Sequence, residues 1–161
     1  MRYLVTPWRE KYITDEIDKG GCFLCEAASS ENPAKKFILF KGEYSFIIMN
    51  LYPYNNGHLL IAPYKHLDSP VKAEKQVLDE MNSLMIKSLD ILTKVYNPHG
   101  FNIGMNLGRA AGAGVPEHFH LHMVPRWDGD SNFMPLFSDT KVMFEGVEKS
   151  YNKLKKYFID I

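Results

Sequence analysis

The sequence has little cysteine, no net charge and no long apolar run. Only two of its 161 residues are cysteine, and a chain of this length can bury a core without disulfide bonds. Lysine plus arginine and aspartate plus glutamate number 19 each, so the net charge is zero with neutral histidines. This balance excludes a global field that would attract nucleic acid or an anionic membrane, so any anionic ligand has to be held locally.

Apolar segments of the kind that targeting and membrane insertion require are also missing. The first residues, "MRYLVTPWREKYI", contain no apolar run of signal-peptide length, and no segment approaches the roughly 20 apolar residues that span a bilayer. No internal repeat, low-complexity segment or linker divides the sequence. We therefore expect one soluble, cytoplasmic domain over residues 1–161, with no nucleic-acid or membrane partner.

Hydrophobic periodicity divides the first two-thirds of the sequence into three parts. Residues 1–36 are expected to form a largely irregular arm with short helical pieces. Residues 37–62 hold apolar, β-branched and aromatic runs around turn residues, which predicts three antiparallel strands, the last closed by Pro63. From residue 71 to 96 apolar residues recur at steps of three and four, which predicts a helix that stops at Pro98 and Gly100.

The remaining third returns to strands and ends in a helix. "GFNIGMN" (residues 100–106) predicts a strand, "LGRAAGAG" a glycine-rich loop, and residues 118–124 a further strand stopped by Pro125. The tail from about residue 139 to 158 is helical by period. The order of elements predicts an α+β fold, in which a long helix and a C-terminal helix pack on an antiparallel sheet of about five strands.

Three of the six histidines fall within "HFHLHMV", at every second position: His118, His120 and His122. Residues two apart on a strand point to the same face. The histidines would then share one face, while Phe119 and Leu121 turn to the core. On a helix the same residues would diverge by roughly 200°. The spacing therefore predicts a histidine row on one face of a strand.

Three explanations could produce such a row: a polar edge face, a shared metal ion, or phosphate chemistry. His118 and His122 would lie about 13 Å apart along a strand, too far for all three to converge easily on one ion. A neutral imidazole is a good nucleophile, and its neighbours can donate to phosphate oxygens. The preceding loop favours phosphate chemistry, because its glycines let backbone N–H groups cradle an anion. They are Gly104, Gly108, Gly112 and Gly114.

Both cysteines lie in "CFLC", at Cys22 and Cys25. In a chain without a secretory signal, a C-x-x-C pair is more often a metal half-site or a redox pair than a structural disulfide. Two cysteines cannot complete a zinc site, so histidines from elsewhere would have to supply the other ligands.

The pattern His-apolar-His-apolar-His-apolar-apolar, met in full by "HFHLHMV", resembles the signature of the histidine-triad superfamily of nucleotide hydrolases and transferases. The resemblance covers nearly the whole chain. "IIMNLYPYNNGHLLIAPYKH" resembles the family's nucleoside-binding loop and its flanking strands, and "NIGMNLGRAAGAGVPEHFHLHMVPRW" its phosphate-binding segment. "TPWREKYI", the C-x-x-C arm and "VPRWDGDSNFMP" look most like the short diadenosine tetraphosphate phosphorylases and the fragile-histidine-triad branch.

The resemblance implies roles for individual residues. His120 matches the nucleophile that attacks the α-phosphorus and forms a nucleotidyl-histidine, and His122 matches a residue that contacts phosphate and helps the leaving group depart. Asn106 matches an amide side chain on the phosphates, Asn50 a residue that holds the ribose, and His58 a residue that supports the triad from the neighbouring strand. Turn chemistry remains the alternative for both asparagines, and a hydrogen-bonded core position for His58.

Relatives with a C-x-x-C arm bind a structural zinc. By resemblance, its ligands here are Cys22, Cys25, His66 in "APYKH", and His118. Two thiolates and two imidazoles suit tetrahedral zinc, and a closed four-ligand shell is structural rather than catalytic. The alternative is a free thiol pair, with His118 only hydrogen-bonded.

The leading hypothesis is an enzyme that cleaves a dinucleoside polyphosphate, with water as the acceptor in a hydrolase or orthophosphate in a phosphorylase. A phosphoramidase that removes AMP from an amine is a second enzymatic hypothesis. A nucleotide-binding or interaction protein without turnover belongs to another class. The resemblance also implies a homodimer with the two sheets edge to edge, and it leaves open a divalent cation that accompanies the nucleotide.

Overall fold

The computed structural model describes residues 21–130, 143–159 and 161. Its α-helices are α2 (Phe23–Ala28), α3 (Lys75–Tyr96) and α5 (Val147–Leu154), and its strands are β1 (Ile38–Lys41), β2 (Ser45–Met49), β3 (Leu59–Pro63), β4 (Gly100–Met105) and β5 (Leu121–Arg126). Short 3-10 turns η2 (Pro33–Lys36), η3 (Pro70–Lys72), η4 (Arg109–Ala111) and η5 (Lys155–Tyr157) complete the list. None of the helices described is long and apolar enough to cross a membrane.

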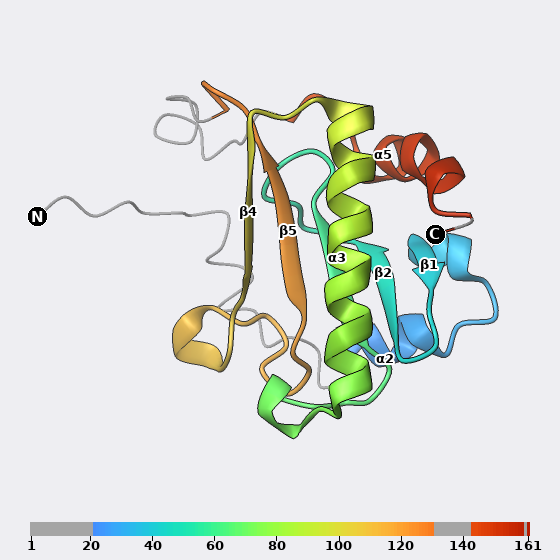
Figure 1. Ribbon diagram of the computed structural model, residues 1–161, viewed down its shortest axis with the longest axis vertical. Helices are drawn as coiled ribbons and strands as arrows, with labels where there is room; N and C mark the ends of the chain where they lie inside the picture. The colour runs from blue at the N-terminus through green and yellow to red at the C-terminus, as the bar shows by residue number, and fades with distance from the viewer. Residues whose placement is uncertain (1–20, 131–142, 160) are drawn as a thin grey trace, which may run out of the picture.

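The five strands form one antiparallel sheet in the order β1-β2-β3-β5-β4 (Figure 1). β4 lies at one edge and β1 at the other. The register places His122 of β5 between Leu60 of β3 and Gly104 of β4. Side chains alternate along each strand, so His122 shares its face of the sheet with Leu60 and not with Leu59 or Ile61.

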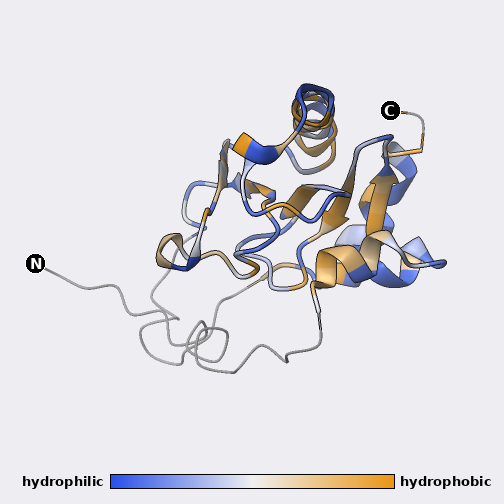
Figure 2. Cartoon of the chain, turned by 90° about the horizontal axis from the view of Figure 1, so that it is seen from below, coloured by the Kyte–Doolittle hydropathy of each residue, from blue (hydrophilic) through white to orange (hydrophobic). Residues whose placement is uncertain are grey.

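Helix α3 covers the opposite face and closes the main core. Its buried residues recur at helical spacing: Val77, Met81, Leu84, Ile91 and Leu92. They pack against the inward residues of β2, β3 and β5, and Figure 2 shows the hydrophobic side of α3 toward the sheet. Tyr151 and Leu154 of α5 and Phe158 join the same core. Burial of these apolar side chains, each contributing about 1.5–3 kcal/mol, fixes the sheet that carries the histidines.

A smaller core lies on the histidine side of the sheet. Leu24 and Ala27 of α2 pack there against Phe46, Ile48 and Leu60. This packing holds the C-x-x-C segment against the sheet, because Cys22 is the N-cap of α2 and Cys25 lies in its first turn. The described part of the predicted arm therefore contains short helical pieces, α2 and η2, and α2 packs against the sheet.

The predicted strand at residues 118–124 is wrong in its position. β5 begins at Leu121 and runs to Arg126, so His118 and His120 precede it. The backbone before Leu121 is held by other contacts: Phe119 N–H donates to Leu67 O at 2.6 Å, and His118 N–H donates to Val115 O at 3.2 Å. Only His120 and His122 are ring neighbours among the three, and His118 turns toward the cysteines.

Three further boundaries differ from the sequence expectation. Pro125 does not stop β5, which continues to Arg126. The pairing of β5 with β3 already ends at Met123, so β3 does not require a backbone N–H from residue 125. The long helix begins at Lys75 rather than residue 71, because residues 70–72 form η3. The C-terminal helix begins at Val147 rather than residue 139, after Gly146 as N-cap. Residues 139–142 of that prediction lie outside the described residues.

Candidate active site and metal cluster

Three imidazole rings, those of His58, His122 and His120, lie next to one another in a row on the face of the sheet that carries His122. His58, which precedes β3, is fully buried, and its Nε2 lies 3.0 Å from Nδ1 of His122. The ring of His122 lies 4.8 Å from the ring of His120, centroid to centroid, at an interplanar angle of 63°. Two of the three predicted triad histidines, His120 and His122, are thus neighbours. His58, predicted to support the triad from the neighbouring strand, lies within hydrogen-bonding distance of His122.

Hydrogen-bond partners assign the protons of these rings. Tyr54 N–H can only donate, and it lies 3.0 Å from Nδ1 of His58, so a neutral His58 carries its proton on Nε2. Nε2–H then donates to Nδ1 of His122, which places the proton of a neutral His122 on its own Nε2. The geometry thus fixes one tautomer for each neutral ring.

The ring of His120 is oriented in the opposite sense. Its Nδ1–H donates to the carbonyl oxygen of His118 at 2.9 Å, so Nε2 carries the lone pair. Burial lowers the pKa of His120, and the bond to the His118 carbonyl opposes that shift in part. Burial therefore favours the neutral imidazole, which is the nucleophilic form.

The two asparagines predicted to bind substrate lie at the two ends of this site. Asn50 has its Nδ2 3.2 Å from Nδ1 of His58, and its Oδ1 accepts from Tyr52 N–H at 3.0 Å, so it also performs the turn chemistry considered as the alternative. Asn106 follows β4 one residue beyond the Met105–Leu121 pair, on the side of His120.

The glycine-rich loop that follows Asn106 includes η4. Gly108 (φ 78°) and Gly112 (φ 81°) adopt the left-handed region that favours glycine, whereas Gly114 does not. Asn106 Nδ2 lies 3.5 Å from Gly112 O, a long contact that still brings the asparagine to the loop. The loop thus has the backbone conformations that would let its N–H groups turn toward an anion.

Cys22, Cys25, His66 and His118 form a second cluster, in which all four candidate ligand atoms lie within 4.8 Å of one another. Nδ1 of His118 lies 3.2 Å from Sγ of Cys22 and 3.4 Å from Sγ of Cys25, and Nδ1 of His66 lies 3.2 Å from the latter. Bonds of about 2.0–2.3 Å to a tetrahedral zinc would separate its ligands by roughly 3.5 Å.

The chemistry of the donor atoms fits a metal as well as the distances do. His118 Nε2–H donates to Pro63 O at 2.9 Å, which leaves the Nδ1 lone pair toward the two cysteines. A carbonyl on the second nitrogen is the usual outer partner of a metal-bound histidine. Burial and the neighbouring Cys22 raise the pKa of the Cys25 thiol to about 11, so a cation in the cluster would have to displace a proton.

Some members of the site gave a weak signal in the sequence, and some gave none. The Tyr54 ring stacks on His122 (centroids 5.8 Å apart) and contacts the His58 ring at a tilt of 40° (4.8 Å), but nothing in "YPYNNG" indicates this. Gly104 pairs with His122, and a Cβ there would meet no atom within 4 Å, so the glycine leaves open space beside His122. The sequence analysis names Gly104 only as one of the glycines before the histidine row, and its pairing with His122 follows from the register of β4 and β5.

Comparison with known proteins identifies the family. A family model described as "HIT domain" matches residues 30–129. The AP-4-A phosphorylase of Mycobacterium tuberculosis H37Rv is 33% identical over 155 residues, covering 89% of this chain and 77% of that protein. The asymmetrical bis(5'-nucleosyl)-tetraphosphatase of Schizosaccharomyces pombe is 25% identical and covers 81% and 68%. The chain belongs to the HIT domain family.

Solved structures agree on the fold. A Zn-bound histidine triad family protein from Mycobacterium smegmatis has a TM-score of 0.67 at 23% identity, covering 86% of this chain and 93% of that one. A hypothetical histidine triad nucleotide-binding protein from Sulfolobus tokodaii also has a TM-score of 0.67, at 26% identity, and covers 85% and 89%. The predicted α+β fold is confirmed, and the named relatives confirm the expectation of a HIT-family enzyme.

Proposed function

We propose that the protein transfers a nucleotidyl group from a dinucleoside polyphosphate through a covalent bond to His120. Nε2 of His120 attacks the α-phosphorus, and the bond from this phosphorus to the bridging oxygen breaks. The bridging oxygen leaves with the electron pair as part of the polyphosphate anion, and Nε2–H of His122 donates a hydrogen bond that offsets the charge on it. Backbone N–H groups of the glycine-rich loop offset the charge that develops on the phosphoryl oxygens. Asn50 and Asn106 hold the ribose and the phosphates.

One observation carries this proposal: the hydrogen bond from His120 Nδ1 to the carbonyl of His118 leaves Nε2 as the lone-pair nitrogen. A histidine can attack phosphorus only through an unprotonated ring nitrogen. His122 beside it has the opposite arrangement, with its proton assigned to Nε2 by His58. A nucleophilic nitrogen and a hydrogen-bond donor therefore lie side by side, on rings with opposite tautomers.

Orthophosphate is the acceptor that we propose for the second step. Its oxygen attacks the phosphorus of the nucleotidyl-histidine, the P–N bond breaks, and the products from diadenosine tetraphosphate are ADP and ATP. The relative named AP-4-A phosphorylase supports this choice, because it is 33% identical, against 25% for the relative named as a tetraphosphatase. With water as acceptor the products would be AMP and ATP.

The test is product analysis with diadenosine tetraphosphate, with and without orthophosphate. We expect ADP and ATP in the presence of orthophosphate, and a covalent adenylyl adduct on the intact protein when orthophosphate is omitted. His120→Ala should form neither products nor adduct, whereas His99→Ala, a histidine outside the site, should retain both. AMP and ATP without orthophosphate would assign a hydrolase. No turnover, with turnover of AMP–amine conjugates instead, would overturn the proposal.

We further propose that Cys22, Cys25, His66 and His118 hold a zinc ion in a closed shell of two sulfur and two nitrogen ligands. Such an ion supplies no reactive position, and it stabilises the folded chain. The cluster joins α2 to the segments after β3 and before β5. The tautomer of His118 supports this assignment, because the bond to Pro63 O leaves Nδ1 for the metal.

A homodimer formed through β4 is the quaternary structure that we propose. β4 pairs with β5 on one side only, and its residues Asn102, Ile103 and Gly104 are exposed. An unpaired strand edge is a template for pairing with another chain, and a second copy of β4 would satisfy its backbone groups. No contact described between these residues and the rest of the chain covers this edge.

A further inference from the structure

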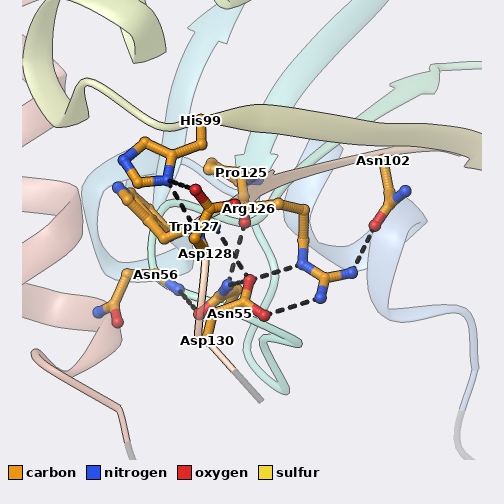
Figure 3. Close-up of polar contacts among 9 residues, drawn as sticks. All are labelled: Asn55, Asn56, His99, Asn102, Pro125, Arg126, Trp127, Asp128 and Asp130. Atoms are coloured by element: carbon orange, nitrogen blue, oxygen red, sulfur yellow. Dashed lines mark hydrogen bonds and ion pairs between the residues drawn. The ribbon is translucent and has the colours of Figure 1, made fainter.

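Asp130 lies at the end of the turn that follows β5 and has a nearly buried carboxylate, with 5% of its side chain exposed. Oδ2 accepts from Nε of Arg126 at 2.6 Å and from Trp127 N–H at 3.1 Å, and Oδ1 accepts from Nη2 of Arg126 at 2.7 Å (Figure 3). Nη1 of Arg126 donates to Oδ1 of Asn102 on β4 at 2.6 Å. The carboxylate thus fixes the end of β5 and, through the arginine, the edge strand.

A further hydrogen bond reaches from this carboxylate to the loop between β2 and β3. Asn55 is 4% exposed, and its Nδ2 donates to Oδ2 of Asp130 at 2.7 Å and to Pro125 O at 3.1 Å (Figure 3). Hydrogen bonds to a carboxylate are roughly twice as strong as neutral ones. The side chain of Asn55 therefore fastens the loop to the strand that carries His122.

The same loop carries two predicted site residues at its ends. His58 N–H donates to Asn55 O at 3.2 Å, and Asn50 N–H donates to His58 O at 3.0 Å. His58 in turn donates through Nε2 to His122. A continuous path of hydrogen bonds thus runs from Asp130 through Asn55 and His58 to the ring of His122.

We propose that Asp130 is a positioning residue for the histidine site: through Asn55 it fixes the loop that holds His58, and His58 orients His122. Asp130 touches no reacting atom, and its effect on chemistry rests on the proposed function. A displacement of about 1 Å in a group that supports a reaction costs on the order of a hundredfold in rate. If the carboxylate had only a structural role, its loss would lower stability and leave the tautomers of His58 and His122 unchanged.

The first test does not require turnover. Long-range ¹H–¹⁵N correlation spectra of the ¹⁵N-labelled protein report the tautomer of each imidazole. In the wild type, His58 and His122 should both be protonated at Nε2. Asp130→Asn keeps the shape of the side chain but presents an amide group to Arg126 and Asn55, and it should shift both rings and populate the second tautomer. Unchanged His58 and His122 signals in a folded Asp130→Asn protein would overturn the proposal.

The matched control comes from the same corner of the molecule. His99 accepts from Asp128 N–H at 3.0 Å in the turn that precedes Asp130, yet no described contact joins it to Asn55 (Figure 3). His99→Ala should therefore leave the His58 and His122 signals unchanged. If Asp130→Asn does not fold, Asn55→Ala removes the same connection from the loop side, and the same two signals decide the outcome.

The second test uses kinetics with diadenosine tetraphosphate. Asp130→Asn should lower kcat by about 10–100-fold with little change in KM. In a His58→Phe background it should have no further effect, because the path to His122 is already broken. Equal losses in both backgrounds would overturn the proposal. A wild-type protein that does not turn over this substrate would overturn the proposed function alone, and the spectra would still decide the role of Asp130.

Discussion

At the scale of single residues, backbone atoms determine what each histidine can do. The carbonyl of His118 binds Nδ1–H of His120, the carbonyl of Pro63 binds Nε2–H of His118, and the N–H of Tyr54 binds Nδ1 of His58. Each backbone partner fixes one ring nitrogen as a hydrogen-bond donor or acceptor, and in a neutral imidazole the other ring nitrogen then takes the opposite part. In the proposed function, these chemically identical side chains therefore take three roles: His120 is the nucleophile, His118 a metal ligand and His58 an orienting group.

We expect His58→Phe to show whether His58 orients His122 for the reaction or only stabilises the core. Phenylalanine keeps a ring beside Tyr54 but removes both nitrogens, so His122 loses its donor and Tyr54 N–H loses its acceptor. The unmet N–H should lower the free energy of unfolding by about 1–3 kcal/mol. The loss of orientation should lower kcat by about 10–100-fold at a temperature at which the variant is fully folded.

Steady-state kinetics and urea unfolding measure the two effects separately. Reduced stability with an unchanged kcat would mean that His58 is only a hydrogen-bonded core histidine. This alternative could not be decided from the sequence, because the pattern "GHLLI" is the same for both.

The histidine spacing and the family resemblance together nevertheless predicted the residues of the candidate site. "HFHLHMV" singled out His120 and His122, and "CFLC" together with the family resemblance selected the four side chains that lie together in the structure. The partners of Asp130 could not be predicted. Asn55, which donates to Asp130 and to the Pro125 carbonyl, lies 75 positions from Asp130 in the chain, and a single sequence carries no signal for such pairs.

At the scale of elements, Glu80 connects α3 to the hairpin between β1 and β2. Its carboxylate accepts from Glu43 N–H at 2.8 Å, from Tyr44 N–H at 2.9 Å and from the Ser45 hydroxyl at 2.6 Å. The Oε1 atom lies only 2.6 Å from where a Cβ on Gly42 would be, so the glycine makes room for the carboxylate. Burial would raise the pKa of Glu80, but the three hydrogen bonds outweigh it and lower the pKa.

We expect Glu80→Gln to destabilise the protein in a pH-dependent way. A lowered pKa in the folded state contributes stability above the ordinary glutamate pKa of about 4.3, and this contribution is lost as the pH falls through the folded value. At pH 7 the variant should lose about 1–3 kcal/mol, this difference should begin to shrink below about pH 4.3, and the two proteins should converge once the pH lies below the lowered folded pKa. Urea unfolding at several pH values measures this, and a difference that does not change with pH would contradict it.

Element types were easier to predict from the sequence than their ends. The three antiparallel strands, the long helix and the final helix follow from apolar period, and all are present. The start of β5 was missed because the alternation in "HFHLHMV" continues through His118 and His120, where contacts with Leu67 and Val115 replace the sheet ladder. Periodicity reports which side chains are buried, and it does not report which backbone groups pair.

At the scale of the whole molecule, the Cys/His cluster connects parts of the chain that are far apart in sequence. Cys22 and Cys25 come from α2, His66 from the turn after β3, and His118 from the segment before β5. A metal there would link α2 to both segments at once. Without it, α2 is held by the small core around Leu24 and Ala27.

Removal of the metal should therefore be measurable as lost stability. We expect one zinc per chain by elemental analysis, none in Cys25→Ser, and a chelator to lower the free energy of unfolding by about 3 kcal/mol or more, the value for a ligand at a hundred times its Kd. Ser83→Ala, on the exposed side of α3, should keep the zinc. Equal unfolding curves with and without chelator would contradict a structural metal.

The proposed dimer predicts a change in mass when β4 is altered. Ile103 is 40% exposed on this edge strand, and Ile103→Lys places a charge on the pairing surface. Sedimentation velocity should show a dimer for the wild type and a monomer for this variant. Ile159→Lys changes a residue that is 70% exposed at the other end of the chain and should remain dimeric. A wild-type monomer would exclude pairing through β4.

His118 belongs to both sites at once: its ring nitrogen lies among the cysteines, and its carbonyl oxygen fixes the ring of His120. A ligand that restrains the ring of His118 therefore also restrains its carbonyl group, and a ligand that restrains the carbonyl group also restrains the ring. Thermodynamic linkage makes the effect reciprocal, so any factor by which zinc tightens nucleotide binding is the factor by which nucleotide tightens zinc binding. If the proposed zinc tightens nucleotide binding, a cell rich in the substrate would keep the metal in this protein longer under metal scarcity than the affinity of the empty enzyme suggests.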